Sequence, residues 1–246
     1  MTPEQESAIA ELRALNLAPK QIARKLGLRP AEVKAIIKQL ATQAAQARTA
    51  AGELDPVVEC LINEEAWALF KLQTLAPGDR EDLATEADIE ADIFDEALGG
   101  LTIVTVTRQA GYNRLIACTY LVDPWCLGIK NVMGPRQVNQ ADYKQFVART
   151  YSMFPSMVTR TITLEQAQAV VFSSLEYAEQ LGFDPHPDFE QARAHLGKWD
   201  GKLRIECGKD GEPFYIDGPY DDPQAVLATL TKSVGEGNFT YIASMG

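Results

Sequence analysis

The sequence predicts an α+β protein with a small domain of three helices at residues 1–48 and a mixed domain of β-hairpins covered by helices at residues 56–246. Three observations predict this fold class. The first 40 residues contain short helical patterns that begin at prolines and end at a glycine. β-Branched runs follow after residue 100, and longer helical patterns with wide apolar faces come later. Residues 49–55 connect the two domains as a linker.

The first helix is predicted from a capping box. Thr2 is placed to cap the helix, and Gln5, three residues later, is placed to reach back to it. Ile9, Leu12 and Leu15 then form a narrow apolar stripe. We expect this helix to supply the third wall of a small core, because the two short helices that follow cannot bury their apolar faces alone.

Residues 17–40 predict two short helices joined by a glycine turn. Pro19 and Pro30 each stand at a first helical position, where the fixed φ of proline is suitable and its missing N–H is not needed. Gly27 falls just past the first of the two helices, where a left-handed residue commonly ends a helix. The apolar residues expected to face inward are Ile22, Leu26, Leu28, Val33, Ile36 and Ile37.

This pair of helices resembles the helix-turn-helix of bacterial transcription factors, particularly the fourth region of sigma factors and the LuxR-type regulators. The resemblance implies that the second helix enters the major groove of DNA, with the outward residues near its N-terminus at base edges. The residues expected to contact DNA are Lys20, Arg24, Lys25, Arg29, Lys34 and Lys38. A second interpretation gives the same three-helix fold a protein-docking role.

The position of each cation predicts what it contacts. Arg29 and Lys34 are suited to guanine edges, whereas Lys38, nearer the far end of the helix, is suited to a phosphate. The cations of the preceding helix suit the DNA backbone. Glu32 does not fit a DNA-facing surface unless it faces away from the groove or pairs with Arg29.

Charge is distributed unevenly along the chain, whose net charge is -11 over 246 residues. Residues 1–48 carry eight Lys/Arg and four Asp/Glu, whereas residues 49–246 carry 15 and 30, so the two parts have net charges of +4 and −15. A basic domain attached to an acidic one is typical of a protein that binds nucleic acid through the basic part. Ordinary solubility chemistry explains the acidic part by itself.

The chain has neither a membrane signal nor a cysteine motif. No apolar run approaches the roughly 18 residues that a membrane-spanning helix requires, and the N-terminal stretch lacks the pattern of a secretory signal. We therefore expect a cytoplasmic protein. The four cysteines contain no C-x-x-C pair and the chain has only two histidines, so neither a zinc site nor a disulfide framework is predicted.

The segment between the two domains gives mixed signals. Residues 41–52 are rich in alanine and glutamine but lack a face to bury, so they either prolong the preceding helix or form a semi-rigid linker. Residues 56–75 have a helical pattern. Residues 77–98 are dense in Asp and Glu, and we expect a solvated acidic helix or a flexible loop. Binding of a divalent cation and contact with the basic domain are the alternatives for this stretch.

Strand and helix signals alternate through the second domain. Residues 101–107 and 114–122 are rich in β-branched and aromatic residues and predict a hairpin, which residues 126–132 extend. A second hairpin is predicted from residues 202–206 and 213–216, with the C-terminal tail as an edge strand. The predicted helices span residues 139–151, 164–181, 188–196 and 223–232.

Three stretches of the second domain, VDPWCLGIKNV, LEYAEQLGFDPHPDFEQA and ECGKDGEPFYIDGPYDDP, resemble segments of a family of uncharacterised bacterial proteins. This resemblance implies neither an activity nor functional residues. A metal-dependent nuclease would use Asp123, Asp217 and either Asp221 or Asp222, together with His186. Each of these aspartates also lies close to proline or glycine, where aspartate is a favoured turn residue.

Two other kinds of site are compatible with the second domain. A thiol nucleophile would pair Cys126 with His186, although a buried structural cysteine explains Cys126 equally well. Phosphate-binding loops would use residues 208–211 or 235–237, and hairpin turns explain both. We therefore predict no catalytic residue, no metal and no cofactor.

Together these features predict a DNA-binding protein with a regulatory role, whose second domain supplies oligomerisation, sensing or partner binding. A homo-oligomer is expected, because one helix-turn-helix makes few phosphate contacts. The alternatives are a metal-dependent hydrolase or nuclease that the first domain targets to DNA, and an adaptor whose first domain docks on a protein.

Overall fold

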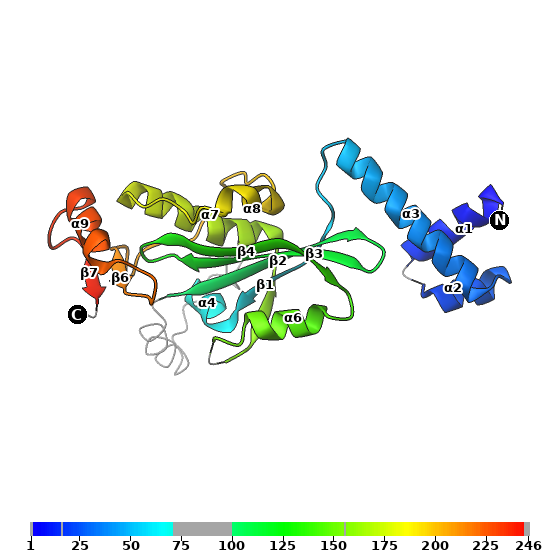
Figure 1. Cartoon of the computed structure of the whole chain (residues 1–246), viewed down its shortest axis with the longest axis horizontal. Helices are drawn as coiled ribbons and strands as arrows, with labels where there is room; N and C mark the ends of the chain where they lie inside the picture. The colour runs from blue at the N-terminus through cyan, green and yellow to red at the C-terminus, as the bar shows by residue number, and fades with distance from the viewer. Residues whose placement is uncertain (1, 16, 71–99, 155, 244–246) are drawn as a thin grey trace.

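The computed structural model describes residues 2–15, 17–70, 100–154 and 156–243. It shows an elongated α+β protein with its two termini at opposite ends (Figure 1). Three N-terminal helices form one end, and we call residues 2–50 the head. A five-stranded antiparallel sheet with its covering helices forms the middle, and a small unit of one helix and two short strands forms the other end. The predicted fold class is confirmed.

Three helices form the head: α1 (Pro3–Ala14), α2 (Pro19–Leu26) and α3 (Pro30–Ala50). They enclose one small core, separate from the cores of the sheet domain. Gly27 ends α2 with a φ of 66°, in the left-handed region that favours glycine. The buried residues of the core are Ile9, Ile22, Ala23, Val33, Ile36 and Ile37.

The start of α1 follows the capping pattern of the sequence, but the expected apolar stripe of this helix does not extend to its end. Thr2 and Gln5 exchange the two hydrogen bonds of a capping box at the start of α1. Leu15, expected to extend the apolar stripe of that helix, is instead 69% exposed. Leu15 follows Ile9 by six residues, which at 3.6 residues per turn places it about 120° around the helix from the buried face.

α3 continues well beyond the helix-turn-helix pattern. It extends through the alanine-rich stretch to Ala50, so two residues of the expected linker are helical. The N–H of Glu53 donates to the carbonyl of Arg48, and Gly52 takes a φ of 68°, which together end the helix. The remaining linker residues then lead directly into the sheet.

The sheet has the strand order β4-β3-β2-β1-β5, and every pair of neighbours is antiparallel. The predicted hairpin forms its centre, with Val106 opposite Cys118 in the β2–β3 register. Both strands are longer than expected, and so is the third strand that follows them. The strands are β1 (Val57–Asn63), β2 (Thr102–Gly111), β3 (Arg114–Asp123), β4 (Gly128–Asn139) and β5 (Thr159–Ile162).

The predicted helical pattern at residues 56–75 is wrong for its first part. Val57–Asn63 forms β1, and of the described residues of this stretch Glu64–Leu69 form a helix, α4. β1 lies between β2 and β5, and its last four residues are buried. A strand covered on both faces has a continuous apolar run rather than an alternating one, so its periodicity does not distinguish it from a helix. The acidic stretch at residues 77–98 lies outside the described residues.

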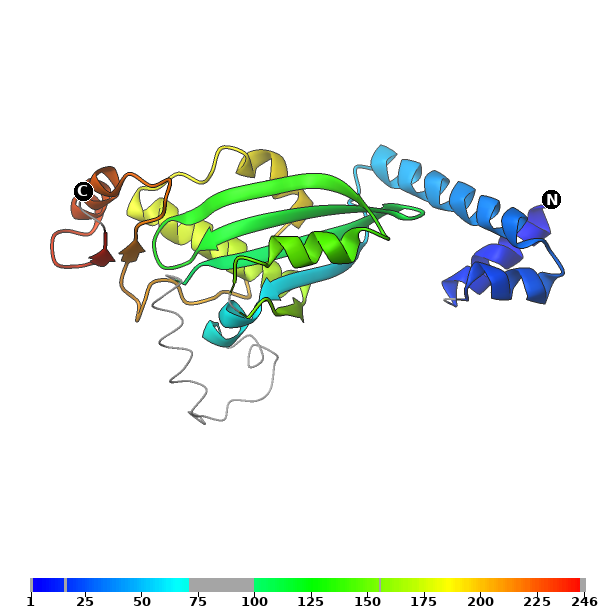
Figure 2. The same ribbon diagram turned by 60° about the horizontal axis from the view of Figure 1, so that its bottom comes forward.

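Helices cover both faces of the sheet (Figures 1 and 2). α7 (Leu164–Leu181) packs on one face as predicted, and it begins at a capping box and ends at a left-handed Gly182. α8 (Phe189–Leu196) lies beside it and contributes Phe189 to the same core. α6 (Tyr143–Thr150) covers part of the opposite face. None of the described helices combines the length and the apolar character that crossing a bilayer requires.

The C-terminal end corrects the second predicted hairpin. The partner of β6 (Phe214–Ile216) is β7 (Thr240–Ile242), and the two strands are parallel. Residues 202–206 form no strand, and Ile205 instead donates its N–H to the Ser173 hydroxyl of α7 at 3.3 Å. α9 (Pro223–Ser233) connects β6 to β7, as the crossover of a parallel pair requires. The sequence predicts the turn at residues 208–211, but it does not predict which strand pairs with β6.

Candidate nucleic-acid interface

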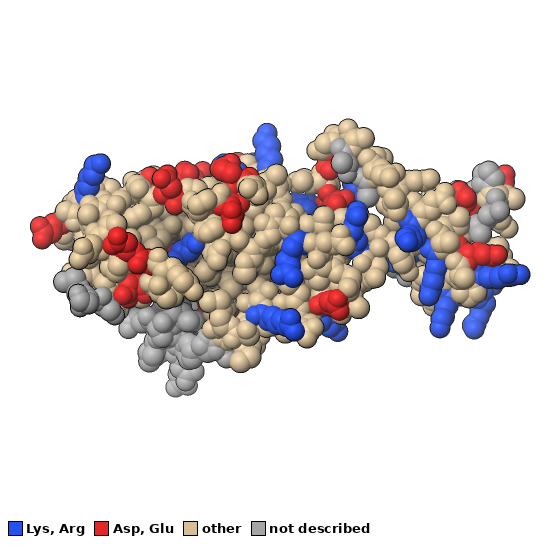
Figure 3. All heavy atoms as spheres, in the orientation of Figure 1, with Lys and Arg blue, Asp and Glu red and all other residues tan. Residues whose placement is uncertain are grey.

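Six cations lie on the outer surface of α2, on the turn that follows it and on the first half of α3. They are Lys20, Arg24, Lys25, Arg29, Lys34 and Lys38, and each is exposed. On α3, the buried Val33 and Ile37 fix the inward face, so Lys34 and Lys38, one turn apart, share an outward one. In Figure 3, Lys and Arg gather on the head along one side. The structure therefore brings together the cations that the sequence selects.

These six cations have no carboxylate partner among the residues that the structure describes. The other two cations of the head differ from them. Arg13 donates to the Leu17 carbonyl at 3.2 Å, and Arg48 forms an ion pair with Asp55. The chain has 34 Asp and Glu against 23 Lys and Arg, so acidic partners are abundant in the sequence. This surface nevertheless keeps its positive charge uncompensated.

A shallow hollow on α2 concentrates this charge. It is lined by Lys20, Gln21, Arg24 and Lys25. Gln21 accepts the Ala18 N–H through its Oε1 at 2.8 Å, which holds the start of the helix. Three cations around an open hollow are suited to a phosphate group, which accepts several charge-assisted hydrogen bonds.

Glu32, the one acidic side chain on this part of the head, has a structural role. Its Oε2 accepts the backbone N–H of Arg29 at 3.1 Å, the reciprocal half of a capping box at the start of α3. Its carboxylate therefore stabilises the helix end and leaves the Arg29 guanidinium without an ion pair among the described residues. The sequence allowed Glu32 either to face away from the groove or to pair with Arg29. Its carboxylate does contact Arg29, but it accepts the backbone N–H of that residue and not the guanidinium.

No protein-family model, no curated protein and no solved structure matches this chain. The assignment of function therefore depends on the geometry of the chain itself.

Asp123, the first of the aspartates considered for metal binding, is a turn residue. Its Oδ1 accepts the N–H groups of Trp125 and Cys126 at 3.0 and 3.1 Å, and its Oδ2 accepts that of Leu127 at 3.0 Å. Burial raises the pKa of Asp123, whereas these hydrogen bonds act in the opposite direction. The side chain thus organises the turn between β3 and β4.

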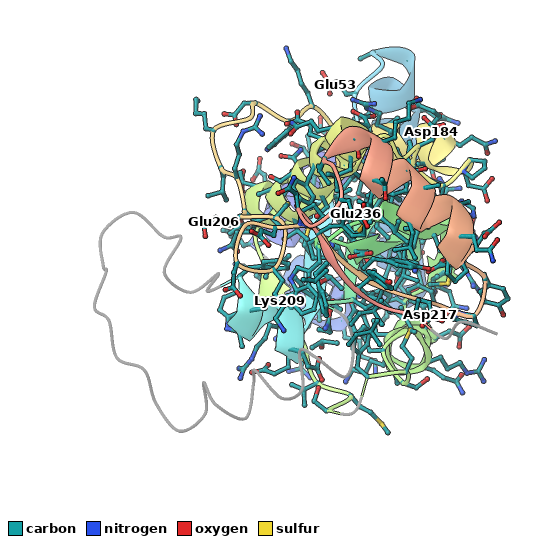
Figure 4. The ribbon with its side chains drawn as sticks, turned by 90° about the vertical axis from the view of Figure 1, so that its left-hand side faces the viewer. Glu53, Asp184, Glu206, Lys209, Asp217 and Glu236 are labelled. Carbon is teal, nitrogen blue, oxygen red and sulfur yellow. The ribbon has the colours of Figure 1, made fainter. Side chains whose placement is uncertain are left out.

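The other aspartates also have local partners. Asp221 accepts the Lys130 ammonium at 2.7 Å and the Gly218 N–H at 2.8 Å, and Asp222 caps α9 through the Ala225 N–H at 3.2 Å. Figure 4, viewed from the α9 end, shows Asp217 apart from the other labelled carboxylates. Among the described residues, no three His, Cys, Asp or Glu side chains form a group that could hold a metal ion.

The cysteine considered as a nucleophile is fully buried. Cys126 packs in the cluster that joins α7 to the C-terminal unit, and burial, followed by the charge of Asp123, raises its pKa. A thiol with a raised pKa stays protonated at neutral pH and is a poor nucleophile. No hydrogen bond joins Cys126 to His186 within the described residues, and the His186 Nδ1 accepts the Asp188 N–H at 3.3 Å.

The two glycine-containing loops are turns. The backbone N–H of Lys209 donates to Glu212 at 2.8 Å and the N–H of Glu212 donates back at 3.0 Å, which closes the loop at residues 208–211 on itself. At residues 235–237, the N–H of Gly235 donates to Thr231 at the end of α9. The loop at residues 208–211 is thus a tight turn as expected, whereas residues 235–237 follow the end of α9 and are not part of a hairpin.

Sequence reasoning missed a basic segment inside the acidic domain. Residues 100–163 carry seven Lys/Arg and two Asp/Glu, a net charge of +5. The rest of the domain carries eight Lys/Arg and 26 Asp/Glu. A count of charge per segment, rather than per domain, would have found it.

Proposed function

We propose that this chain is a DNA-binding protein with a regulatory role, whose head contacts duplex DNA through α2 and α3. The observation that carries the proposal is the set of six exposed cations on these two helices and the turn between them, none with a carboxylate partner in the described part of the chain. A polyanion with regularly spaced phosphates compensates such a surface, and release of its counterions drives binding. The resemblance of residues 17–40 to a helix-turn-helix supports duplex DNA as that polyanion.

The proposal assigns two tasks within the head. Lys20, Arg24 and Lys25 bind phosphates, because they surround the hollow on α2. Arg29 and Lys34 approach base edges from the start of α3, where a recognition helix reads the major groove. Cytoplasmic location follows from this role, since DNA in a bacterial cell is there.

We further propose that the protein acts as a homodimer. One head offers few phosphate contacts, and two heads about one helical turn apart on the DNA would supply the affinity that a regulator needs. Sedimentation velocity at micromolar concentration tests this part, and a strictly monomeric profile would contradict it without affecting the role of the head.

The DNA-binding proposal is tested by fluorescence anisotropy of a labelled random-sequence duplex with the full chain across a salt series. The variant Lys34→Glu/Lys38→Glu is compared with a matched control, Lys198→Glu/Lys232→Glu, which reverses two exposed cations of the second domain. We expect the affinity of the head variant to fall at least tenfold and that of the control to be retained. For each phosphate that is no longer neutralised, the slope of log affinity against log salt should decrease by about 0.9.

Failure of the wild-type chain to bind duplex DNA at low salt, with its helical circular dichroism intact, would contradict the proposal. The docking role of the three-helix fold then becomes the better account, and the same head variant tests it against protein partners. Cleavage of DNA that requires a divalent metal would instead favour the targeted nuclease.

A further inference from the structure

The sheet domain has its own basic surface on and beside α6. Residues 100–163 include seven Lys/Arg, and four of them are either buried or bonded to another group of the domain. Arg108 is buried, Lys130 pairs with Asp221, Arg160 pairs with Glu64, and Arg114 donates to a backbone carbonyl at 2.6 Å. The three that remain are Arg136, Lys144 and Arg149, which we call the α6 patch.

The α6 patch is exposed and uncompensated. Lys144 and Arg149 project from α6, a helix without any acidic residue, and both are exposed. Arg136 lies on β4 with its guanidinium 5.3 Å from the centre of the Phe146 ring of α6, so a cation–π contact holds it beside them. None of the three has a carboxylate partner among the described residues.

Two acidic side chains beside α6 are hydrogen-bonded to other groups. Asp142, which immediately precedes α6, accepts the Asn139 side-chain amide. Glu59 of β1 accepts the Tyr143 hydroxyl at 2.8 Å. Hydrogen bonds to neutral groups thus direct both carboxylates away from ion pairs with the patch.

Basic side chains occur both around α6 and on the head in one view of the molecule. In Figure 3, Lys and Arg are spread from the middle of the protein, where Figure 1 places α6, to the head, whereas Asp and Glu predominate toward the α9 end. An ion pair and a hydrogen bond hold the connection between the head and the sheet. Arg48 at the end of α3 pairs with Asp55, and the Asp55 carbonyl accepts Arg108 of β2 at 2.7 Å.

We propose that the α6 patch is a second DNA-backbone contact, which binds the continuation of the duplex that the head holds. This inference rests on the proposed function of the head. The patch presents cations to phosphates and does not place a recognition helix in a groove. It therefore contributes affinity and not sequence preference. α3 contains 21 residues and spans about 31 Å, which corresponds to roughly nine base pairs of duplex. A duplex must therefore extend well beyond the head to reach the patch.

The test compares duplexes of 12 and 36 base pairs, using anisotropy with the full chain at several salt concentrations. The variant Lys144→Glu/Arg149→Glu is measured beside Lys198→Glu/Lys232→Glu, which makes the same change in net charge away from α6. We expect the affinity of the patch variant to fall at least tenfold for the longer duplex and to match the control on the shorter one. Its salt slope on the longer duplex should decrease by about 2, because two phosphates are no longer neutralised.

Two results would overturn the inference: a patch variant that equals the control on both duplexes, or one that weakens both equally. Binding of the wild type that depends on Lys34 and Lys38 but not on the patch would leave the head proposal intact, so the two proposals fail separately. The neutral variant Lys144→Gln/Arg149→Gln, with the urea midpoint as a fold check, replaces the reversed one if that protein unfolds. We expect the neutral variant to decrease the salt slope by at least half as much as the charge-reversed variant does.

Discussion

The guanidinium of Arg48 donates through both Nε and Nη2 to Oδ1 of Asp55, at 3.2 and 3.1 Å. This ion pair joins the last turn of α3 to the segment that enters β1. Both side chains are about three-quarters buried, so the pair is less screened than one at an open surface. The backbone of Asp55 is held in addition, because its carbonyl accepts Arg108. The connection between head and sheet is thus fixed at both ends.

The first prediction concerns this connection. Asp55→Asn keeps an acceptor but removes the charge, so we expect the segment between α3 and β1 to open more often and cleavage after Glu53 by a glutamyl endopeptidase to accelerate several-fold. The cost in unfolding free energy should be about 0.5–1 kcal/mol. Asp200→Asn, in an exposed pair with Lys202, is the control. Equal cleavage rates in both variants and the wild type would show that the ion pair does not restrain the connection.

Arg108 gives the second prediction. Its guanidinium, 6% exposed, donates to the carbonyls of His195 at 2.8 Å, Asp55 at 2.7 Å and Leu196 at 3.4 Å. Burial lowers the pKa of Arg108, because it removes water from the charged guanidinium. Arg108→Met removes that cost but leaves the carbonyls without a donor, and we expect a net loss of about 2–4 kcal/mol in unfolding free energy, measured by urea denaturation.

Arg108→Lys tests the geometry of this contact, since one ammonium cannot reach three carbonyls on two segments as a planar guanidinium does. It should recover part of the loss and no more. A Met variant as stable as the wild type would mean that desolvation of the guanidinium outweighs its hydrogen bonds.

The third prediction is a dependence of stability on pH through His195. This side chain is 8% exposed, its Nε2–H donates to the Val106 carbonyl at 3.1 Å, and burial lowers its pKa below the usual 6.5. As the pH falls below 6.5, the unfolded chain binds a proton at this site before the folded protein does. Stability is therefore lost toward lower pH, by at most about 1.4 kcal/mol per pH unit.

Urea denaturation between pH 7 and 5.5 measures this effect. His195→Gln should have a shallower decline than the wild type, because the glutamine does not titrate. His186→Gln removes the other histidine of the chain and serves as the control. Identical slopes for His195→Gln and the wild type would assign the decline to other groups.

The fourth prediction separates the two effects of Glu32. Glu32→Gln keeps an oxygen that can accept the Arg29 N–H but removes a negative charge from the head, so DNA should bind about two- to threefold more tightly with little change in Tm. Glu32→Ala should gain similar affinity and melt at a lower temperature, because the helix end loses its acceptor. Anisotropy and thermal circular dichroism measure the two quantities. Weaker DNA binding by the Gln variant would contradict the orientation assigned to α3.

The sequence was most informative where structure is local. The capping box at Thr2, the glycine that ends α2 and the box at the start of α7 each depend on residues within one or two turns of one another, and all three are present. The β2–β3 hairpin is local in the same sense, since a tight turn brings its strands together. The head cations were identified for this reason, because the helical period alone sets which side chains face outward.

Contacts between distant segments were where sequence reasoning failed. The sequence of β1 predicts a helix because burial on both faces removes the alternation that identifies a strand. Its place between β2 and β5 supplies that burial. The partner of β6 is β7, across the whole of α9, and no local pattern encodes such a pairing. The α6 patch was missed for a related reason, since Arg136 joins α6 only through the fold.

The sequence by itself therefore determined the α+β class, the three helices of the head and the cations they expose, because helix period, caps and charge act over a few residues. Only the tertiary structure shows that Arg48, Asp55 and Arg108 connect the head to the sheet and that Arg136 lies beside α6. Arg108 lies 53 residues from Asp55 in the chain, so this contact depends on packing that no short stretch of sequence contains.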